Sequence, residues 1–166
     1  MGKFLANVVK DQDQALPYLE KSVALAPDST YGFMKLGEVY EALGRREEAV
    51  KCYERALENY RADLESDPDD CCNYEGAADV LVHLGRLEEA EEMAHRAIAL
   101  ECRVFTCSCR YCFESYEDLA KVEEKRGNLE KALEQMEKAG RYSTSDYYPR
   151  EIARLRQALK TQKESV

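Results

Sequence analysis

The sequence contains no tryptophan, and only four prolines and eight glycines occur among its 166 residues. Because proline and glycine interrupt helices and supply turns, their scarcity favours a helical chain over a β fold rich in loops. No stretch is long and apolar enough to cross a lipid bilayer as a helix. Hydrophobic residues nevertheless make up 45% of the chain, which predicts a folded protein rather than wholesale disorder.

Positive charge is also scarce. The chain has 24 lysines and arginines against 33 aspartates and glutamates, for a net charge of -9. Nucleic acids and anionic membranes require a basic face, so this balance argues against both as main partners. The first residues, MGKFLANVV, make a poor secretory signal, and Ala6 stands where a myristoylation pattern needs serine or threonine. We therefore expect a cytoplasmic protein.

One short stretch of the sequence recurs along the chain. LGRREEA at 43–49 returns as LGRLEEA at 84–90 and as RGNLEKA at 126–132. The shared alanines, Ala49, Ala90 and Ala132, are 41 and 42 residues apart, and Ala15 takes the same place 34 residues before Ala49. Repetition at such a period predicts an array of similar units that stack on one another.

Each unit has the pattern of two helices joined at a glycine. In the second unit we expect a first helix from about residue 30 to 43, followed by Gly44 where the backbone must turn left-handed. A second helix then starts with Glu47 and Glu48, whose charge suits a helix N-terminus, and the helical spacing continues through Tyr60 and Leu64. Small residues let the two helices approach closely, and large residues fill the remaining gaps.

This pattern resembles the tetratricopeptide repeat (TPR) family, whose motif is W-x2-L-G-x2-Y, then A-x3-F, then an alanine and a proline. The corresponding positions of the second unit are Phe33, Leu36, Gly37, Tyr40, Ala49, Tyr53 and Ala56. The third and fourth units keep the alanines in register, with Ala94 and Met136 at the aromatic position of the second helix. The resemblance implies an all-α fold, an α-solenoid of antiparallel helix hairpins with a longer period than usual.

The repeat register also predicts the organisation of the chain. We expect one TPR-like domain over 1–166, made of a partial repeat at 1–29, repeats at 30–70, 71–112 and 113–148, and a capping helix at 149–163. The residues that exceed the usual period are expected as extra segments between units, at RADLESDPDD and CRVFTCSCRYC. Glu123 stands where a core aromatic is expected, which predicts loose packing in the fourth unit.

Features of an enzyme are missing from the sequence. It has no glycine-rich phosphate loop, no nucleophile elbow and no H-E-x-x-H motif, and it has only two histidines. The acidic pairs at helix starts are explained by the helix dipole. We therefore predict a protein that is not an enzyme.

Cysteine is the residue type that suggests other chemistry. Seven cysteines cannot all pair with one another, and four of them fall close together: Cys102, Cys107, Cys109 and Cys112. Thiolates at short spacing can hold zinc, although this spacing matches no common zinc module and cysteine also packs as a small apolar residue. We expect no cofactor, with a zinc site or a thiol redox switch at these four residues as the alternative.

Cys71 and Cys72 lie near a helix start, which predicts a lowered thiol pKa.

In the family that the sequence resembles, the first helices of successive units line a concave groove that binds peptides or helices. Matching the register places ten residues in that groove: Tyr31, Met34, Glu38, Glu41, Glu75, Asp79, His83, Glu114, Glu117 and Lys121. The basic clamp with which some members bind a chaperone's C-terminal carboxylate is absent, since Met34, Glu38, Gly76, Glu114 and Asp118 stand at its positions.

The resemblance therefore predicts a non-catalytic protein–protein interaction scaffold. Because the ten positions are mostly acidic, the partner is expected to be a basic or amphipathic segment of a protein, and not nucleic acid or a membrane. Two alternatives remain: the ten residues are only a solvated surface, or the chain is a zinc-binding or thiol-regulated module that works through its cysteines.

Overall fold

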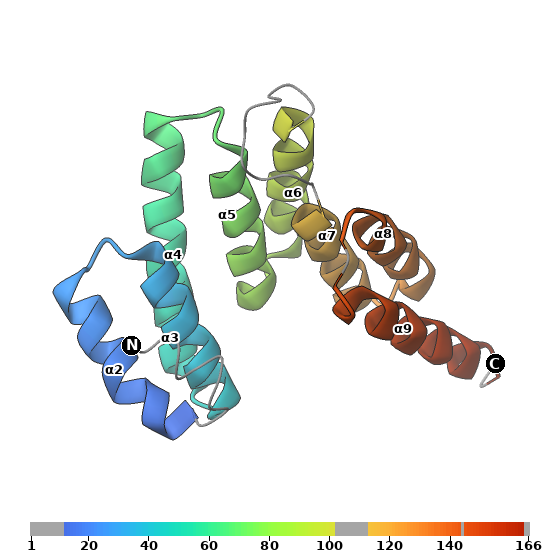
Figure 1. Cartoon of the computed structure of the whole chain (residues 1–166), viewed down its shortest axis with the longest axis horizontal. Helices are drawn as coiled ribbons and strands as arrows, with labels where there is room; N and C mark the ends of the chain where they lie inside the picture. Colours follow the sequence, from blue (N-terminus) through green and yellow to red (C-terminus); the bar gives the residue numbers. More distant parts are fainter. Residues whose placement is uncertain (1–11, 102–112, 144, 165–166) are drawn as a thin grey trace. The chain divides into compact units, whose positions relative to one another are not determined.

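The computed structural model describes residues 12–101, 113–143 and 145–164, and within these ranges the chain is helical without any strand. The helices are α2 (Gln12–Leu25), α3 (Thr30–Ala42), α4 (Arg46–Ser66), α5 (Cys71–Leu84), α6 (Leu87–Glu101), α7 (Phe113–Lys125), α8 (Leu129–Tyr142) and α9 (Tyr147–Glu164). In Figure 1, α3 lies beside α4 and α7 beside α8 as the two arms of hairpins. The predicted all-α class, an α-solenoid of helix hairpins with a capping helix, is confirmed.

The turns between the arms of the hairpins share one backbone geometry. Gly44, Gly85 and Gly127 have φ angles of 73°, 74° and 80°, the left-handed region that favours glycine. The residue after each glycine donates its N–H to the carbonyl five positions earlier, in the bonds Arg45–Tyr40 (2.8 Å), Arg86–Leu81 (2.9 Å) and Asn128–Glu123 (2.9 Å). These bonds satisfy carbonyls left over at the end of each first helix and reverse the chain within a few residues.

The first extra segment is helical. Residues 61–66 continue α4, which has 21 residues where α8 has 14, a difference of about two helical turns. This agrees with the second helix predicted to continue through Leu64, and it shows that part of the extra segment expected around RADLESDPDD lengthens that helix. The second segment, CRVFTCSCRYC, lies outside the described residues.

Contacts divide the chain into two compact units, residues 1–68 with 83–85 and residues 69–82 with 86–166, and each is described by itself. In the first unit α3 packs on α4 where Gly37 faces Tyr53. A Cβ atom at Gly37 would lie only 2.6 Å from a ring carbon of Tyr53. The glycine is therefore required because the tyrosine ring, which is 2% exposed, fills the place of a side chain.

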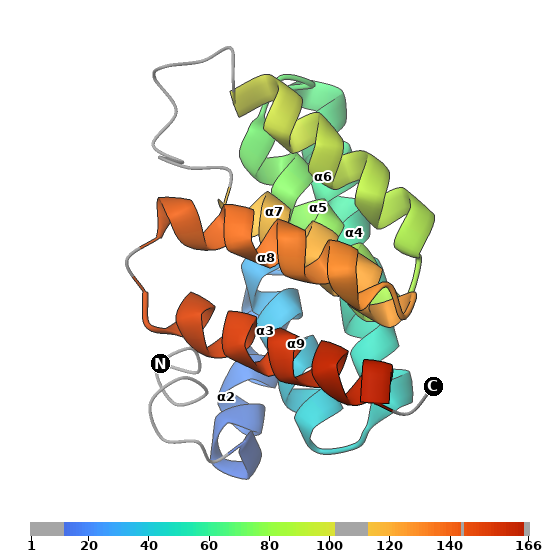
Figure 2. The same ribbon diagram turned by 90° about the vertical axis from the view of Figure 1, so that its right-hand side faces the viewer.

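The second unit has its largest core where α9 covers the last hairpin. Tyr148 and Leu155 of α9 are buried in one cluster with Ala120, Ala132, Met136 and Ala139. Figure 2 shows α9 running along α8. Basic residues of α9 add ion pairs to α7 and α8, namely Arg154–Glu124 (2.7 Å), Arg156–Glu137 (2.6 Å) and Lys163–Glu130 (2.8 Å). The helix thus covers an apolar face on one side and presents polar residues on the other.

The packing around Glu123 differs from the prediction. Its residue is 8% exposed, and its carboxylate accepts a hydrogen bond of 2.7 Å from the Asn128 side chain. Arg126 lies 3.6 Å away and offers a compensating charge. Glu123 therefore ties the end of α7 to the turn at Gly127, and the expectation of loose packing was wrong.

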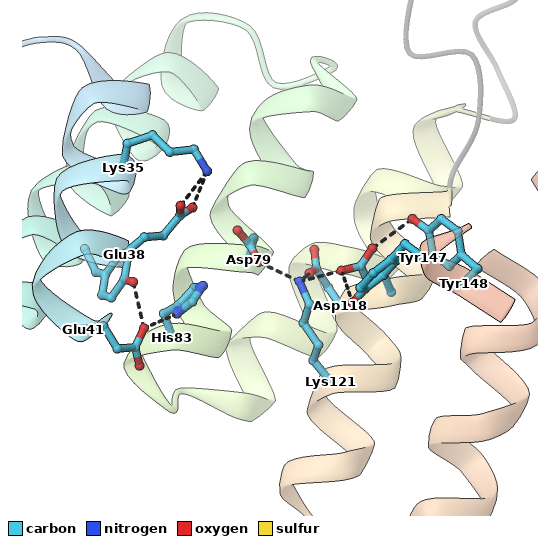
Figure 3. A network of polar contacts seen from close by, with 11 residues as sticks. Lys35, Glu38, Glu41, Asp79, His83, Asp118, Lys121, Tyr147 and Tyr148 are labelled. Atoms are coloured by element: carbon cyan, nitrogen blue, oxygen red, sulfur yellow. Dashed lines mark hydrogen bonds and ion pairs between the residues drawn. The ribbon is translucent and has the colours of Figure 1, made fainter. Parts of the chain in front are cut away.

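Lys121 joins α5 to α7 within the second unit. Its Nζ atom lies 3.0 Å from Asp79 of α5 and 3.1 Å and 3.2 Å from Asp118 and Glu117 of α7 (Figure 3). Burial alone would lower the pKa of Lys121, but the three carboxylates outweigh it and raise that pKa. Burial raises the pKa of Asp118, which is 2% exposed, well above its usual range in spite of the nearby lysine. Lys121 therefore keeps its charge, and the carboxylates depend on it.

Replacing Gly37 with alanine should lower the free energy of unfolding by about 1 kcal/mol. Alanine gains about 1 kcal/mol in helix propensity, but a methyl group forced into a packed core costs about 1–3 kcal/mol. Urea denaturation measures the difference. In a Tyr53→Leu background the same replacement should be neutral or stabilising, because leucine leaves room; an equal loss in both backgrounds would show that the ring is not the cause.

Replacing Lys121 with methionine should destabilise the protein by about 2 kcal/mol at pH 7. Removing one partner of a fully buried ion pair costs ~3–5 kcal/mol, and we expect a smaller loss here because the lysine side chain is 34% exposed. Burial raises the pKa of Asp118, and without the lysine this carboxyl keeps a higher pKa in the folded state than in the unfolded state. Its ionisation therefore destabilises the fold as the pH rises, and the deficit should shrink when unfolding is measured at pH 4.5.

The control for this variant is Lys131→Met, which removes an exposed lysine of α8. It should change stability by no more than about 0.5 kcal/mol at either pH. A deficit of Lys121→Met that is the same at pH 7 and pH 4.5 would contradict the role assigned to the carboxylates.

Candidate functional site

The ten predicted groove residues all lie on the first helices of the hairpins. α3 carries Tyr31, Met34, Glu38 and Glu41, α5 carries Glu75, Asp79 and His83, and α7 carries Glu114, Glu117 and Lys121. Every one of them is exposed or half-buried. Glu41 and His83 belong to the first unit, whereas Asp79, Glu117 and Lys121 belong to the second.

In the first unit the structure brings Glu41 and His83 together with Tyr53. The Tyr53 hydroxyl donates to Glu41 Oε2 at 3.0 Å, and His83 Nδ1 lies 2.9 Å from the same oxygen (Figure 3). Because an ionised carboxylate only accepts hydrogen bonds, Nδ1 is the protonated ring nitrogen in this contact. The rings of Tyr53 and His83 stack, with centroids 4.7 Å apart and planes 21° apart. Two aromatic residues thus hold one carboxylate in place.

The other predicted residues of α3 have partners of different kinds. Lys35 donates to both carboxylate oxygens of Glu38, at 2.5 Å and 2.7 Å, and its Nζ lies 5.5 Å from the centre of the Tyr31 ring. The Met34 sulfur accepts a hydrogen bond of 3.1 Å from the Tyr60 hydroxyl. The Tyr31 residue remains 42% exposed. The charge of Glu38 is therefore balanced locally, and Tyr31 presents an aromatic surface to solvent.

In the second unit the predicted residues form part of the network around Lys121. Besides the lysine, Glu117 accepts hydrogen bonds from the hydroxyls of Tyr148 (2.9 Å) and Tyr147 (3.3 Å) at the start of α9. Burial and the Glu117 carboxylate raise the pKa of Tyr147 to about 12. Both tyrosines are therefore protonated hydrogen-bond donors at neutral pH. Asp79 and Glu117 are thus already engaged by side chains of the same chain.

The predicted metal ligands Cys102, Cys107, Cys109 and Cys112 lie outside the described residues, so that hypothesis stays a prediction. Within the described part, ligand atoms of Asp70, Cys71 and Cys72 lie within 4.8 Å of one another.

The thiol pKa of Cys72 is not lowered by the helix start. Lost hydration, with the neighbouring Cys71 and Asp70, raises this pKa to about 12. Asp70 accepts the Cys72 N–H at 2.9 Å and so already fills the place of an N-cap. A thiol that stays protonated at neutral pH is a poor nucleophile, and a metal ion must displace its proton to bind.

Cys52 has the packing role expected from its place inside α4. It is 7% exposed, and burial raises its pKa to about 11.

Sequence reasoning missed several residues of these networks. Lys35 and Asp118 were not weighed as ion-pair partners, although each stands three positions from its partner on the same helix, a spacing at which side chains meet. Tyr53 was identified only as a position of the repeat motif. Tyr147 and Tyr148 contact Glu117, about 30 positions away, and no local sequence pattern predicts such contacts.

None of the helices in the described ranges combines the length and the apolar character needed to span a membrane. This agrees with the absence of long apolar runs in the sequence.

Known proteins resemble this chain in sequence. Over 104 residues the chain is 29% identical to the Arabidopsis thaliana protein kinesin light chain-related 3, in an alignment that covers 55% of this chain. The chain spans only 16% of the length of that relative.

Solved structures resemble it in fold. A thermophilic TPR protein of Thermus thermophilus matches with a TM-score of 0.61 and 26% identity, over 95% of this chain and 77% of its own. The first TPR domain of the human RPAP3 protein matches with a TM-score of 0.53 and 20% identity, over 85% of this chain and 100% of its own. The second likeness concerns the fold alone.

The sequence profile of the tetratricopeptide repeat matches residues 28–100 and again residues 69–141, which together exceed half of the chain. The repeated glycine turns, the buried alanines in register and the similar structures agree with this match. The chain therefore belongs to the tetratricopeptide repeat family, whose members are generally non-catalytic scaffolds for protein–protein interaction.

Proposed function

We propose that this chain is a non-catalytic scaffold that binds peptides or helices of a partner protein through the accessible faces of its first helices, α3 in the first unit and α5 with α7 in the second. The observation that carries the proposal is the set of polar and aromatic side chains that α3, α5 and α7 leave exposed or half-buried beside their buried residues. Tyr31, Glu41 and Glu114 are among them, whereas Leu36, Ala78 and Leu119 of the same helices are buried. Such faces offer side chains for recognition without disturbing the core.

The charges on these faces favour a basic or amphipathic partner. Lys35 balances Glu38, and Lys121 is shared by Asp79 and Glu117, so part of the acidic charge is compensated within the chain. One lysine cannot neutralise the several carboxylates around it, and exposed Glu114 adds another negative charge to α7. Complementary charge speeds association and selects partners more than it adds raw affinity.

A zinc-binding or thiol-regulated module is the second candidate. The closeness of Asp70, Cys71 and Cys72 supports it, whereas the raised thiol pKa of Cys72 weighs against it.

Charge reversal on the first helices should weaken capture of the partner. We expect the double variant Glu75→Lys with Glu114→Lys to recover at least about tenfold less partner in a quantitative pull-down, which corresponds to ~1.4 kcal/mol. Asp79 and Glu117 are left intact in this test, because reversing either would disturb Lys121 and the fold.

The matched control is Glu54→Lys with Glu92→Lys, which makes the same change in net charge at exposed positions of the second helices α4 and α6. This control should recover as much partner as the wild type. Equal recovery by the Glu75/Glu114 variant and the control would overturn the proposed surface.

Metal analysis separates the two candidate functions. The scaffold proposal expects protein purified without oxygen to contain no stoichiometric zinc. About one equivalent of zinc, lost in a Cys107→Ser and Cys109→Ser variant, would favour the second candidate instead, because four thiolates are a typical structural zinc site.

A further inference from the structure

We propose that Glu41 is the anchor point for an arginine side chain of the partner. This inference rests on the proposed peptide-binding function and names the chemistry of one contact within it. It is carried by the way in which Tyr53 and His83 hold the Glu41 carboxylate.

The two oxygens of Glu41 have different surroundings. Oε2 accepts the Tyr53 hydroxyl and contacts His83 Nδ1, at 3.0 Å and 2.9 Å. Oε1 contacts no donor among the described residues, and the Glu41 side chain is 43% exposed. One oxygen thus fixes the carboxylate and the other faces solvent as an acceptor.

The fixed oxygen is held from inside the protein. Tyr53 is 2% exposed and its ring occupies the space that Gly37 leaves on α3, so core packing restricts the position of its hydroxyl. The His83 ring stacks on it. A surface glutamate normally loses rotational freedom when it binds a partner, and here that freedom is already restricted before binding.

Glu41 differs in this respect from three other carboxylates of the first helices, Glu38, Glu117 and Asp118. Both oxygens of Glu38 accept from Lys35, and the two oxygens of Glu117 accept from Lys121 with Tyr147 and from Tyr148. Asp118 is buried against Lys121. Among these groups Glu41 is the carboxylate that is fixed and still open to a cation.

An arginine suits this acceptor better than a neutral donor. Its guanidinium group always carries charge and presents several N–H donors in a rigid plane, which gives directional, charge-assisted hydrogen bonds to carboxylates. The net charge of -9 favours a cationic ligand in addition.

An array of amphipathic dodecapeptides, made in pairs that differ only by arginine or citrulline at one position, tests the proposal. Citrulline keeps the shape of arginine and lacks its charge. By fluorescence anisotropy, the wild type should bind the arginine member of its best pairs about tenfold more tightly, as expected for one charge-assisted hydrogen bond at a partly exposed site. Glu41→Gln should reduce this preference to less than about twofold.

Two further variants sharpen the test. Glu54→Gln neutralises an exposed glutamate of α4 and should keep the tenfold preference of the wild type. Tyr53→Phe removes only the hydroxyl that positions Glu41, and should reduce the preference to about threefold while leaving the binding of the citrulline peptides unchanged. Weaker binding of both peptides of a pair by the same factor would show that Tyr53 acts only on stability.

The outcomes separate this inference from the function on which it rests. If the wild type binds no peptide of the array, the proposed peptide binding fails and this inference fails with it. If the wild type binds both members of each pair equally, or if Glu41→Gln keeps the preference, peptide binding stands and the role of Glu41 is wrong.

Discussion

The contact between Gly37 and the Tyr53 ring is the constraint on which the first unit depends. The ring occupies the space of a missing side chain, which brings α3 and α4 into close contact and fixes the direction of the tyrosine. The hydroxyl at the end of that ring then reaches the surface beside Glu41. A packing requirement in the core therefore decides where one surface carboxylate points, and a residue of the repeat motif contributes both to stability and to the accessible face.

The second unit solves the same packing problem with other side chains. At the positions of Gly37 and Tyr53 it has Ala78 with Ala94 in one hairpin and Ala120 with Met136 in the next, and all four are buried. Glycine, the smallest first-helix residue, faces tyrosine, whereas alanine faces the smaller alanine or the more flexible methionine. The combined volume of each pair therefore varies less than the volume of the second-helix residue alone. With alanine and methionine in place of Tyr53, the second unit orders its acidic groups around Lys121 and the hydroxyls of Tyr147 and Tyr148 instead.

Much of the fold could be predicted because its determinants are local. The left-handed turns at Gly44, Gly85 and Gly127 and the buried alanines follow from backbone geometry and periodicity. The extent of α4 could be predicted as far as Leu64 from the helical spacing of Tyr60 and Leu64, whereas the extra segment around RADLESDPDD followed from the repeat length alone. The thiol pKa of Cys72 was misjudged because lost hydration and nearby acidic groups outweigh the helix dipole.

The polar networks were harder to predict, since they join distant parts of the sequence. Lys121 and Asp79 are 42 residues apart, and Tyr148 and Glu117 are 31 residues apart. The repeat register places such residues on first helices, but it does not say which of them meet. That depends on the rotamers and helix packing of the folded units.

The ion pairs of Lys35 and Lys121 limit what can be inferred about function from the net charge of the chain. At physiological ionic strength, charges farther apart than about 8 Å are largely screened, so an overall charge of -9 guides an approaching partner without selecting it. Selection requires a directional contact at a fixed acceptor. Since Lys35 and Lys121 already engage several of the acidic groups, the carboxylates left accessible and held in place carry more information about the partner than the number of acidic residues does. In the scaffold that we propose, specificity would then depend on the residues that the chain pairs internally as much as on those that it exposes.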